Sequence, residues 1–323
     1  MHLLGFITVL LGISLITFAL YYFSPGDKAE AIARATYEGE IAFSNEVIQG
    51  IIIKHGLDKP FFDQYLAWLL KTLSGDFGNS WVSNAPAIDI FMENVGGTLE
   101  LSAYSLMLGL FIAFLLSILC YIYPGSVIDK AAIAISSIGA AIPNFWLALI
   151  LIFVFSVSLN WLPSYGSDSF SHQILPVITL SFWVISSQTR LLRSFFLEAK
   201  QAPFISTLRM RGVSEVEIFL KHVIPHSTSS ALTMIALDLA HLLEGAIIIE
   251  IIFVRGGLGS LLIYSVGARD YPMLILLTLF SAIVYLLTNI FVEQVQSLLD
   301  PRKRVALLKN KKIKVSSLIP SKN

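Results

Sequence analysis

The sequence is poor in cysteine and in charge. It has one cysteine among 323 residues, Cys120, and 14% of its residues are charged. A single cysteine excludes an internal disulfide bond and any metal site built from several thiolates. The formal net charge is zero, which gives nucleic-acid binding no electrostatic support. The chain also lacks a G-x-x-x-x-G-K-[ST] run, the phosphate-binding loop of many ATPases.

Apolar residues dominate instead. They make up 55% of the sequence, and the mean hydropathy of +0.75 is too high for a soluble domain. Residues 1–23 are almost entirely apolar, and a helix of this length can cross a hydrocarbon core of about 30 Å. A cleaved signal peptide is the alternative, but no lysine or arginine precedes the apolar run and no small-residue cleavage site follows it. We therefore expect an uncleaved first transmembrane helix.

A polar segment, residues 24–98, follows the first apolar run. It carries ten acidic and five basic residues, so we expect it on the extracytoplasmic side. Apolar side chains recur at helical spacing between Leu57 and Leu73, which predicts an amphipathic helix packed on the membrane face. This segment is expected to be an ordered domain.

The rest of the chain contains five more apolar blocks. They cover residues 99–121, 132–159, 174–190, 231–253 and 273–292. The expected fold is therefore all-α: six transmembrane helices, with five of them forming a core over residues 99–299. In the second of these blocks, Pro143 and Asn144 should kink or break the helix and free backbone carbonyls for a protein-lined or wet cavity. A kink that serves packing alone is the alternative.

A basic loop, residues 190–227, separates the fourth and fifth helices. Between Arg190 and Lys221 it has six basic and three acidic residues, the imbalance of a cytosolic loop. Gly212 can adopt the positive φ that ends a helix, and Ser214 can cap the next one. We therefore predict a helix, a glycine turn and a second helix, with a further segment beginning near Pro225.

Gly212 and Pro225 also stand at the spacing of a known motif: Glu-Ala-Ala, three residues, Gly, nine residues, Ile-x-Leu-Pro. In this respect the loop resembles that of permease subunits of binding-protein-dependent ABC importers. The match is partial, because residues 206–208 are Ser-Thr-Leu and His222 and Ile224 replace Ile and Leu. The resemblance implies that the loop docks on an ATPase subunit. Its residues in that role would be Glu198, Ala199, Leu208, Arg209, Arg211, Gly212 and Pro225. An ordinary amphipathic loop is the alternative.

Other segments narrow the resemblance to one branch of these permeases. Residues 56–60 and 75–78 are similar to the dipeptide, oligopeptide and nickel permeases, and residues 142–146 and 161–163 to the nickel type in particular. Residues 256–259 and 269–272 are also similar to family signatures. The resemblance implies a transport subunit, not an enzyme, without a cofactor of its own. Its partners would be a homologous second permease in a heterodimer, two ATP-binding subunits, an extracytoplasmic binding protein and the lipid bilayer.

The distribution of basic residues favours a multi-pass protein of the bacterial inner membrane, with both of its termini in the cytosol. Fifteen of the 22 lysines and arginines would then lie inside. Eight of these are in residues 300–323, which we expect to be a basic, solvated tail near anionic lipid heads.

Three ionisable residues interrupt the fifth apolar helix at i, i+3 steps: Asp238, His241 and Glu244. They share one face, and ionisable groups at this depth usually pair or face a wet cavity. With Pro143 and Asn144 they are candidates for a translocation path, and His241 for a transient metal ligand. A hydrogen-bonded patch between two permease subunits is the alternative.

These features together predict the permease subunit of an importer for nickel or a nickel chelate. The same role for di- or oligopeptides is the alternative. A membrane-embedded enzyme is a more remote one, because the sequence contains neither H-E-x-x-H nor G-x-S-x-G. A channel acting alone is disfavoured by the loop at residues 190–227.

Overall fold

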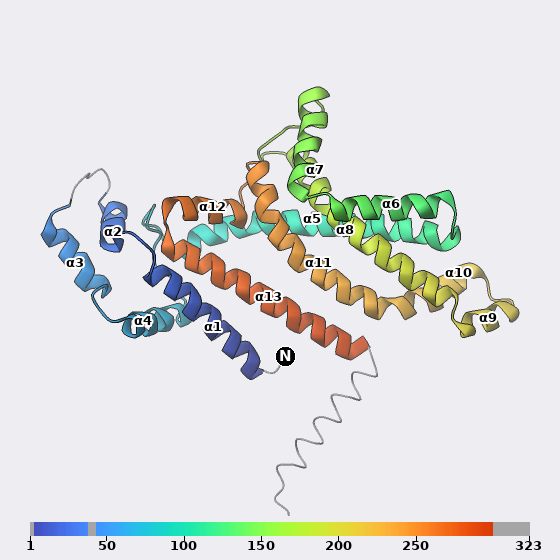
Figure 1. Ribbon diagram of the computed structural model, residues 1–323, viewed down its shortest axis with the longest axis horizontal. Coiled ribbons are helices and arrows are strands. Elements are labelled where there is room, and N and C mark those ends of the chain that lie inside the picture. Colours follow the sequence, from blue (N-terminus) through green and yellow to red (C-terminus); the bar gives the residue numbers. More distant parts are fainter. Residues whose placement is uncertain (1–2, 38–42, 300–323) are drawn as a thin grey trace, which may run out of the picture. The chain divides into compact units, whose positions relative to one another are not determined.

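The computed structural model describes residues 3–37 and 43–299, apart from some side chains within helices, that of Glu244 among them (Figure 1). The described chain is helical, which confirms the all-α prediction for this part, and its one β-bridge is an isolated contact between Asn79 and Pro86. The predicted tail at residues 300–323 lies outside the described residues. The chain divides into two compact units.

The first unit comprises Met1–Leu101, Pro163–His172 and Ala246–Leu286. Its helices are α1 (Leu3–Tyr22), α2 (Lys28–Thr36), α3 (Asn45–His55), α4 (Phe61–Leu73), the beginning of α5 (Ala87–Ile122), the end of α11 (Ile224–Ile252), α12 (Leu258–Ala268) and most of α13 (Tyr271–Leu299).

An aromatic cluster joins α4 to the first apolar helix. The ring of Phe18 on α1 lies 5.7, 5.6 and 5.3 Å from the rings of Phe61, Tyr65 and Trp68. A hydrogen bond of 2.9 Å between the hydroxyls of Ser14 and Tyr65 adds to this contact. The predicted amphipathic helix between residues 57 and 73 is thus confirmed, and it packs on the first span.

The second unit comprises Ser102–Leu162, Gln173–Gly245 and Leu287–Asn323. Its helices are the remainder of α5, α6 (Val127–Ala141), α7 (Asn144–Leu151), the π-helix η1 (Ile152–Ser158), most of α8 (Phe170–Lys200), α9 (Pro203–Met210), α10 (Glu215–Ile218), the π-helix η2 (Phe219–Val223) and most of α11.

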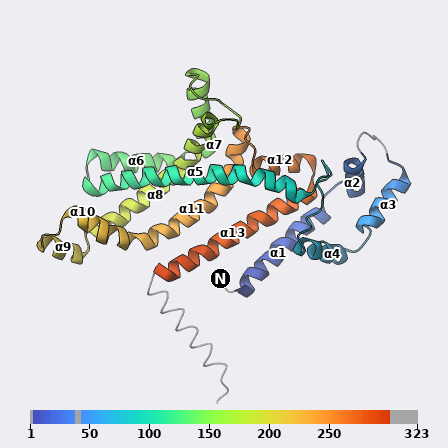
Figure 2. The ribbon, with the colours of Figure 1, turned by 180° about the vertical axis from the view of Figure 1, so that it is seen from behind.

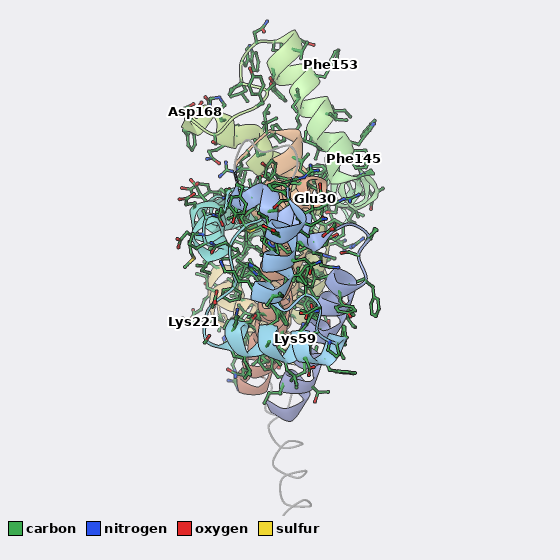
Figure 3. The ribbon with its side chains drawn as sticks, turned by 90° about the vertical axis from the view of Figure 1, so that its left-hand side faces the viewer. Glu30, Lys59, Phe145, Phe153, Asp168 and Lys221 are labelled. Carbon is green, nitrogen blue, oxygen red and sulfur yellow. The ribbon has the colours of Figure 1, made fainter. Side chains whose placement is uncertain are left out.

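The predicted break at Pro143 is present. Helix α6 ends at Ala141, α7 begins at Asn144, and the two directions differ by 105°. Proline has no N–H to donate to the preceding turn, so the α6 ladder cannot continue through it. Beyond the bend, the side chains of Phe145 on α7 and Phe153 on η1 are exposed (Figure 3). The single span expected at residues 132–159 is therefore a bent pair.

Among the residues that the structure describes, four helices are long and apolar enough to cross a membrane, or five if the bent pair counts as one span. The expectation of six is thus supported in part. The span predicted at residues 231–253 falls on α11, several of whose side chains lie outside the described part, and it stays a prediction. Two predicted boundaries were also too narrow: α5 begins at Ala87 rather than residue 99, and α8 runs from Phe170 to Lys200 rather than from 174 to 190.

Candidate functional site

The loop after α8 has the helix–turn–helix form that its sequence predicts. Helix α9 begins with Pro203 at its first position and ends at Met210. Gly212 follows with φ of +77°, a conformation that side chains rarely adopt. The Ser214 hydroxyl then accepts a 3.3 Å hydrogen bond from the Glu217 N–H and caps α10. Figure 1 and Figure 2 show α9 and α10 together beyond the end of α8.

An ion pair links the two short helices. The Arg209 guanidinium donates to both carboxylate oxygens of Glu215, at 2.5 and 3.1 Å. These hydrogen bonds lower the pKa of Glu215 below its ordinary value. Because both side chains are partly exposed, we expect well under about 1 kcal/mol from the pair. Its main effect is to fix the angle of α9 against α10.

A hydrophobic cluster holds the loop on its underside. Its buried members come from α5, α8, the loop itself and α11: Tyr121, Leu192, Phe196, Ala199, Ile205, Ile218, Val223 and Ala231. The predicted loop residues Ala199 and Leu208 belong to this buried side, whereas Glu198 and Arg211 are exposed. Lys200 strengthens the attachment, because its Nζ donates to the Tyr121 carbonyl at 2.6 Å.

A second attachment lies nearby. The Arg193 guanidinium donates to both oxygens of the buried Asp129 carboxylate, at 2.5 and 2.8 Å. Asp129 also accepts from the Gly125 N–H at 2.8 Å and so ties α8 to the turn between α5 and α6. The loop therefore rests on a fixed base.

The opposite side of the loop is apolar and exposed. We call it the α9–α10 outer face, and it consists of Phe204, Met210, Val216 and Leu220, which are 42%, 81%, 70% and 57% exposed. The ring of Phe204 lies 6.4 Å from that of His222 and 6.0 Å from that of His226. Exposed apolar side chains on a rigid base are typical of protein-docking surfaces.

Pro225 is the second residue of α11. It cannot donate to the carbonyl of residue 221, and the helix widens into the π-helix η2 just before it. The segment boundary predicted at this proline is therefore a change of helix type.

The intramembrane residues are only partly brought together. The carboxylate of Asp238 is buried and accepts from Gln188 Nε2 at 2.6 Å and from Ser187 Oγ at 3.0 and 3.1 Å. His241 is exposed, with its ring against that of Trp183 at 5.2 Å. The side chain of Glu244 lies outside the described part.

Asp238 is thus occupied by donors from α8. Among the described residues, no group of three His, Cys, Asp or Glu could hold a metal ion. Asn144, at the start of α7, lies beside α11: its amide nitrogen would be 3.5 Å from a Cβ at Gly245. The break after α6 therefore lies next to α11 at Gly245, one helical turn beyond His241.

A buried carboxylate that the sequence reasoning missed organises α12. Glu250 has no exposed surface; its Oε1 accepts from Thr98 Oγ1 at 2.6 Å, and its Oε2 from the N–H of Gly259 at 2.7 Å and of Ser260 at 3.3 Å. It thus caps the positive end of a helix to which it is not adjacent in sequence. A Cβ at Gly257 or Gly259 would collide with this carboxylate. Gly257 and Gly259 make room for this internal acid, and an acid seven and nine residues before two glycines was the available signal.

Comparison with known proteins gives concordant results. Residues 105–305 match the family described as binding-protein-dependent transport system inner membrane component, and residues 1–102 match its N-terminal membrane-component family. Over 303 residues the chain is 32% identical to the glutathione transport system permease protein GsiC of Escherichia coli strain K12 and to that of Salmonella choleraesuis strain SC-B67. These alignments cover 94% of this chain and 97% of each relative.

Two solved structures of the inward-facing MetNI methionine ABC transporter have a similar fold. Their TM-scores are 0.50 and 0.52, with 20% and 21% identity, and the matches cover 64% and 65% of this chain and 97% and 96% of those chains. At this identity the likeness concerns the fold alone.

Proposed function

Because the chain belongs to the family of binding-protein-dependent transport system inner membrane components, we propose that it is a permease subunit of an ABC importer for short peptides of about tripeptide size. As a multi-pass permease it is a transport component and not an enzyme. We assign ATP hydrolysis to two separate subunits, and we expect no cofactor in this chain.

The substrate proposal replaces nickel by a peptide. The curated relatives named above are glutathione permeases, and glutathione is a tripeptide, so they favour the peptide alternative. The described residues give nickel no support, because Asp238 is engaged by Ser187 and Gln188. His241, Pro143 and Asn144 remain candidates for the path, now for a polar peptide.

The observation that carries the proposal is the α9–α10 outer face on its fixed base. In this account the outer face docks on an ATPase subunit, and the Arg209–Glu215 pair and the cluster beneath transmit its movement to α8 and α11. That role places α9, α10 and both termini in the cytosol. Residues 24–98 then lie outside, where a substrate-binding protein delivers peptide to this subunit and a homologous second permease.

Uptake by intact bacteria tests the proposal. Cells lacking this gene should lose uptake of labelled glutathione or a labelled dipeptide and regain it with the wild-type gene, while nickel uptake stays unchanged. Loss of nickel uptake with normal peptide uptake would reverse the substrate assignment.

A further inference from the structure

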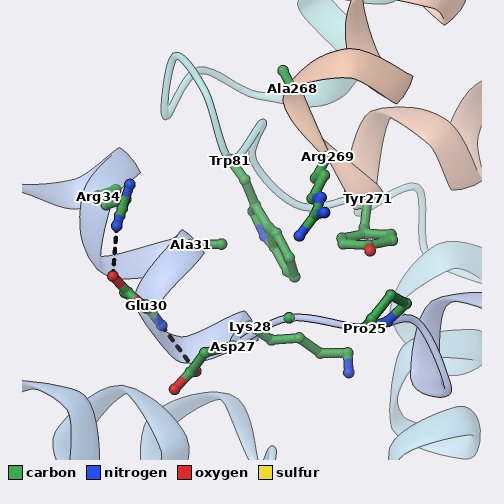
Figure 4. Close-up of a pocket in the computed structure, with 11 residues that line it drawn as sticks. Pro25, Asp27, Lys28, Glu30, Ala31, Arg34, Trp81, Ala268, Arg269 and Tyr271 are labelled. Carbon is green, nitrogen blue, oxygen red and sulfur yellow. Dashed lines mark hydrogen bonds and ion pairs between the residues drawn. The ribbon is translucent and has the colours of Figure 1, made fainter.

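The first unit contains a cleft of about 320 Å³ beyond the end of α1 (Figure 4). Three segments line it: the turn and helix from Pro25 to Arg34, the loop at Trp81, and the turn from Ala268 to Tyr271. Its volume is within the range of about 300–1,000 Å³ found for small-molecule pockets.

Three basic side chains line the cleft, and two of them are already engaged. The Arg34 guanidinium pairs with Glu30 at 2.6 Å, and Lys28 Nζ donates to the Tyr22 carbonyl at 3.0 Å. Within the described part of the chain, the Arg269 guanidinium forms no ion pair or hydrogen bond. Arg269 is therefore the cation left for a ligand.

The acidic residues of the cleft do not neutralise Arg269. The Asp27 carboxylate accepts from the N–H groups of Ala29 and Glu30, at 2.9 and 3.1 Å, and caps α2. The Glu30 carboxylate forms its ion pair with Arg34. The uncommitted charge of the cleft is thus positive, which selects an anionic group.

A buried acid holds the two sides of the cleft in register. Asp270 is 3% exposed and accepts from Ser80 Oγ at 2.5 Å and from the Trp81 N–H at 3.0 Å. The loop that carries Trp81 is thereby fastened to the turn that carries Arg269. The rings of Trp81 and Tyr271 lie 5.3 Å apart, and Figure 4 shows both rings and the Arg269 side chain on the lining of the cleft.

The backbone around Arg269 also favours a role for its side chain. Arg269 ends α12 with φ of +57°, a position where glycine avoids strain. Opposite it, Gly26 has φ of +120°, and a Cβ there would be 3.2 Å from Arg269 Nη1. The chain thus places an arginine in a strained position and leaves space for its guanidinium.

We propose that this cleft binds the terminal carboxylate of a short peptide before it enters the membrane path. Arg269 donates two N–H groups to the carboxylate oxygens, and the Trp81 and Tyr271 rings pack on the apolar part of the peptide. The inference rests on the proposed peptide transport and adds a recognition site on this subunit, separate from the external binding protein.

Direct binding tests the site. The transporter complex is purified through a tag on this chain, without binding protein, and titrated with reduced glutathione or with glutathione diamide, in which both carboxylates are amides. Tryptophan fluorescence follows binding, and Trp81→Phe identifies the signal that comes from the cleft. Glutathione should give a saturable change, and the diamide should bind roughly tenfold more weakly.

Two variants and a control complete the test. Arg269→Gln should weaken glutathione binding roughly tenfold, and Arg269→Lys, which keeps the charge, should weaken it less. Lys71→Gln, an exposed change on α4, should leave it unchanged. The diamide comparison uses wild-type protein, so it does not depend on the folding of a variant.

Three results would overturn the proposal. They are equal binding of glutathione and its diamide, unchanged binding by Arg269→Gln, and displacement by inorganic phosphate at equal concentration, which indicates a general oxyanion site. If intact cells import glutathione but the cleft does not bind it, this inference alone fails. If the cells do not import peptide, the proposed substrate fails as well.

Discussion

Removing the buried carboxylate of Glu250 should destabilise the first unit more than any surface change. Three donors converge on it: Thr98 Oγ1, the Gly259 N–H and the Ser260 N–H. In Glu250→Ala all three lose their acceptor in a buried place. At about 1–3 kcal/mol for each unsatisfied donor, with partial relief by water, we expect a loss of about 3–5 kcal/mol.

Glu250→Gln separates charge from shape. The amide oxygen can still accept from Gly259 and Ser260, and the rotatable Thr98 hydroxyl can accept from the amide nitrogen. The loss should therefore be smaller, about 1–2 kcal/mol. Glu93→Gln, an exposed change on α5, is the matched control and should have no measurable effect.

The assay is thermal unfolding of the purified complex in detergent, together with protease sensitivity of the α12 segment. Melting temperatures should fall in the order control, Glu250→Gln, Glu250→Ala, with α12 cleaved first in the alanine variant. Equal melting temperatures for Glu250→Ala and the control would show that the carboxylate does not hold α12, and would refute the reasoning.

Three further changes have definite expected outcomes. Gly212→Val places a β-branched residue at φ of +77° and should abolish transport without affecting membrane insertion; normal substrate-stimulated ATPase activity would contradict this. The Arg209 hydrogen bond lowers the pKa of Glu215, so this pair stabilises the loop above the ordinary glutamate pKa, and the contribution is lost as pH falls through the lowered value. The rate of amide hydrogen exchange in α10 should rise over this pH range, and Glu215→Gln should remove that dependence on pH. Val254, just after α11, has a φ of +47°, which glycine adopts without strain. Val254→Gly should therefore stabilise the protein by about 1 kcal/mol and raise its melting temperature. A melting temperature below that of the wild type would show that the packing of the valine side chain outweighs the strain.

Local rules account for what the sequence predicted well. Gly212 and Ser214 define a turn and a cap within three residues, Pro143 removes a backbone donor where α6 ends, and the apolar spacing before Leu73 marks α4. Each of these depends on near neighbours in the chain, where backbone sterics and periodicity decide the outcome.

The features that sequence reasoning missed depend on distant partners. Glu250 is a helix cap only because Thr98 and the α12 glycines reach it through the fold. Asp238 stays a candidate path residue, but its donors on α8 lie about 50 residues earlier and cannot be predicted from its own helix. The spacing of charges along one helix cannot show which neighbouring helix supplies their partners.

The measurement that most directly tests the central claim is ATP-driven uptake by proteoliposomes containing this chain with its second permease and ATPase subunits. With binding protein added, labelled glutathione should accumulate only when ATP is present on the cytosolic side. Met210→Asp on the α9–α10 outer face should abolish accumulation and ATPase association, whereas Ile53→Asp, an equally drastic change at an exposed residue of α3, should leave both near wild type. Full uptake with Met210→Asp, or accumulation of nickel in place of the peptide, would contradict the account.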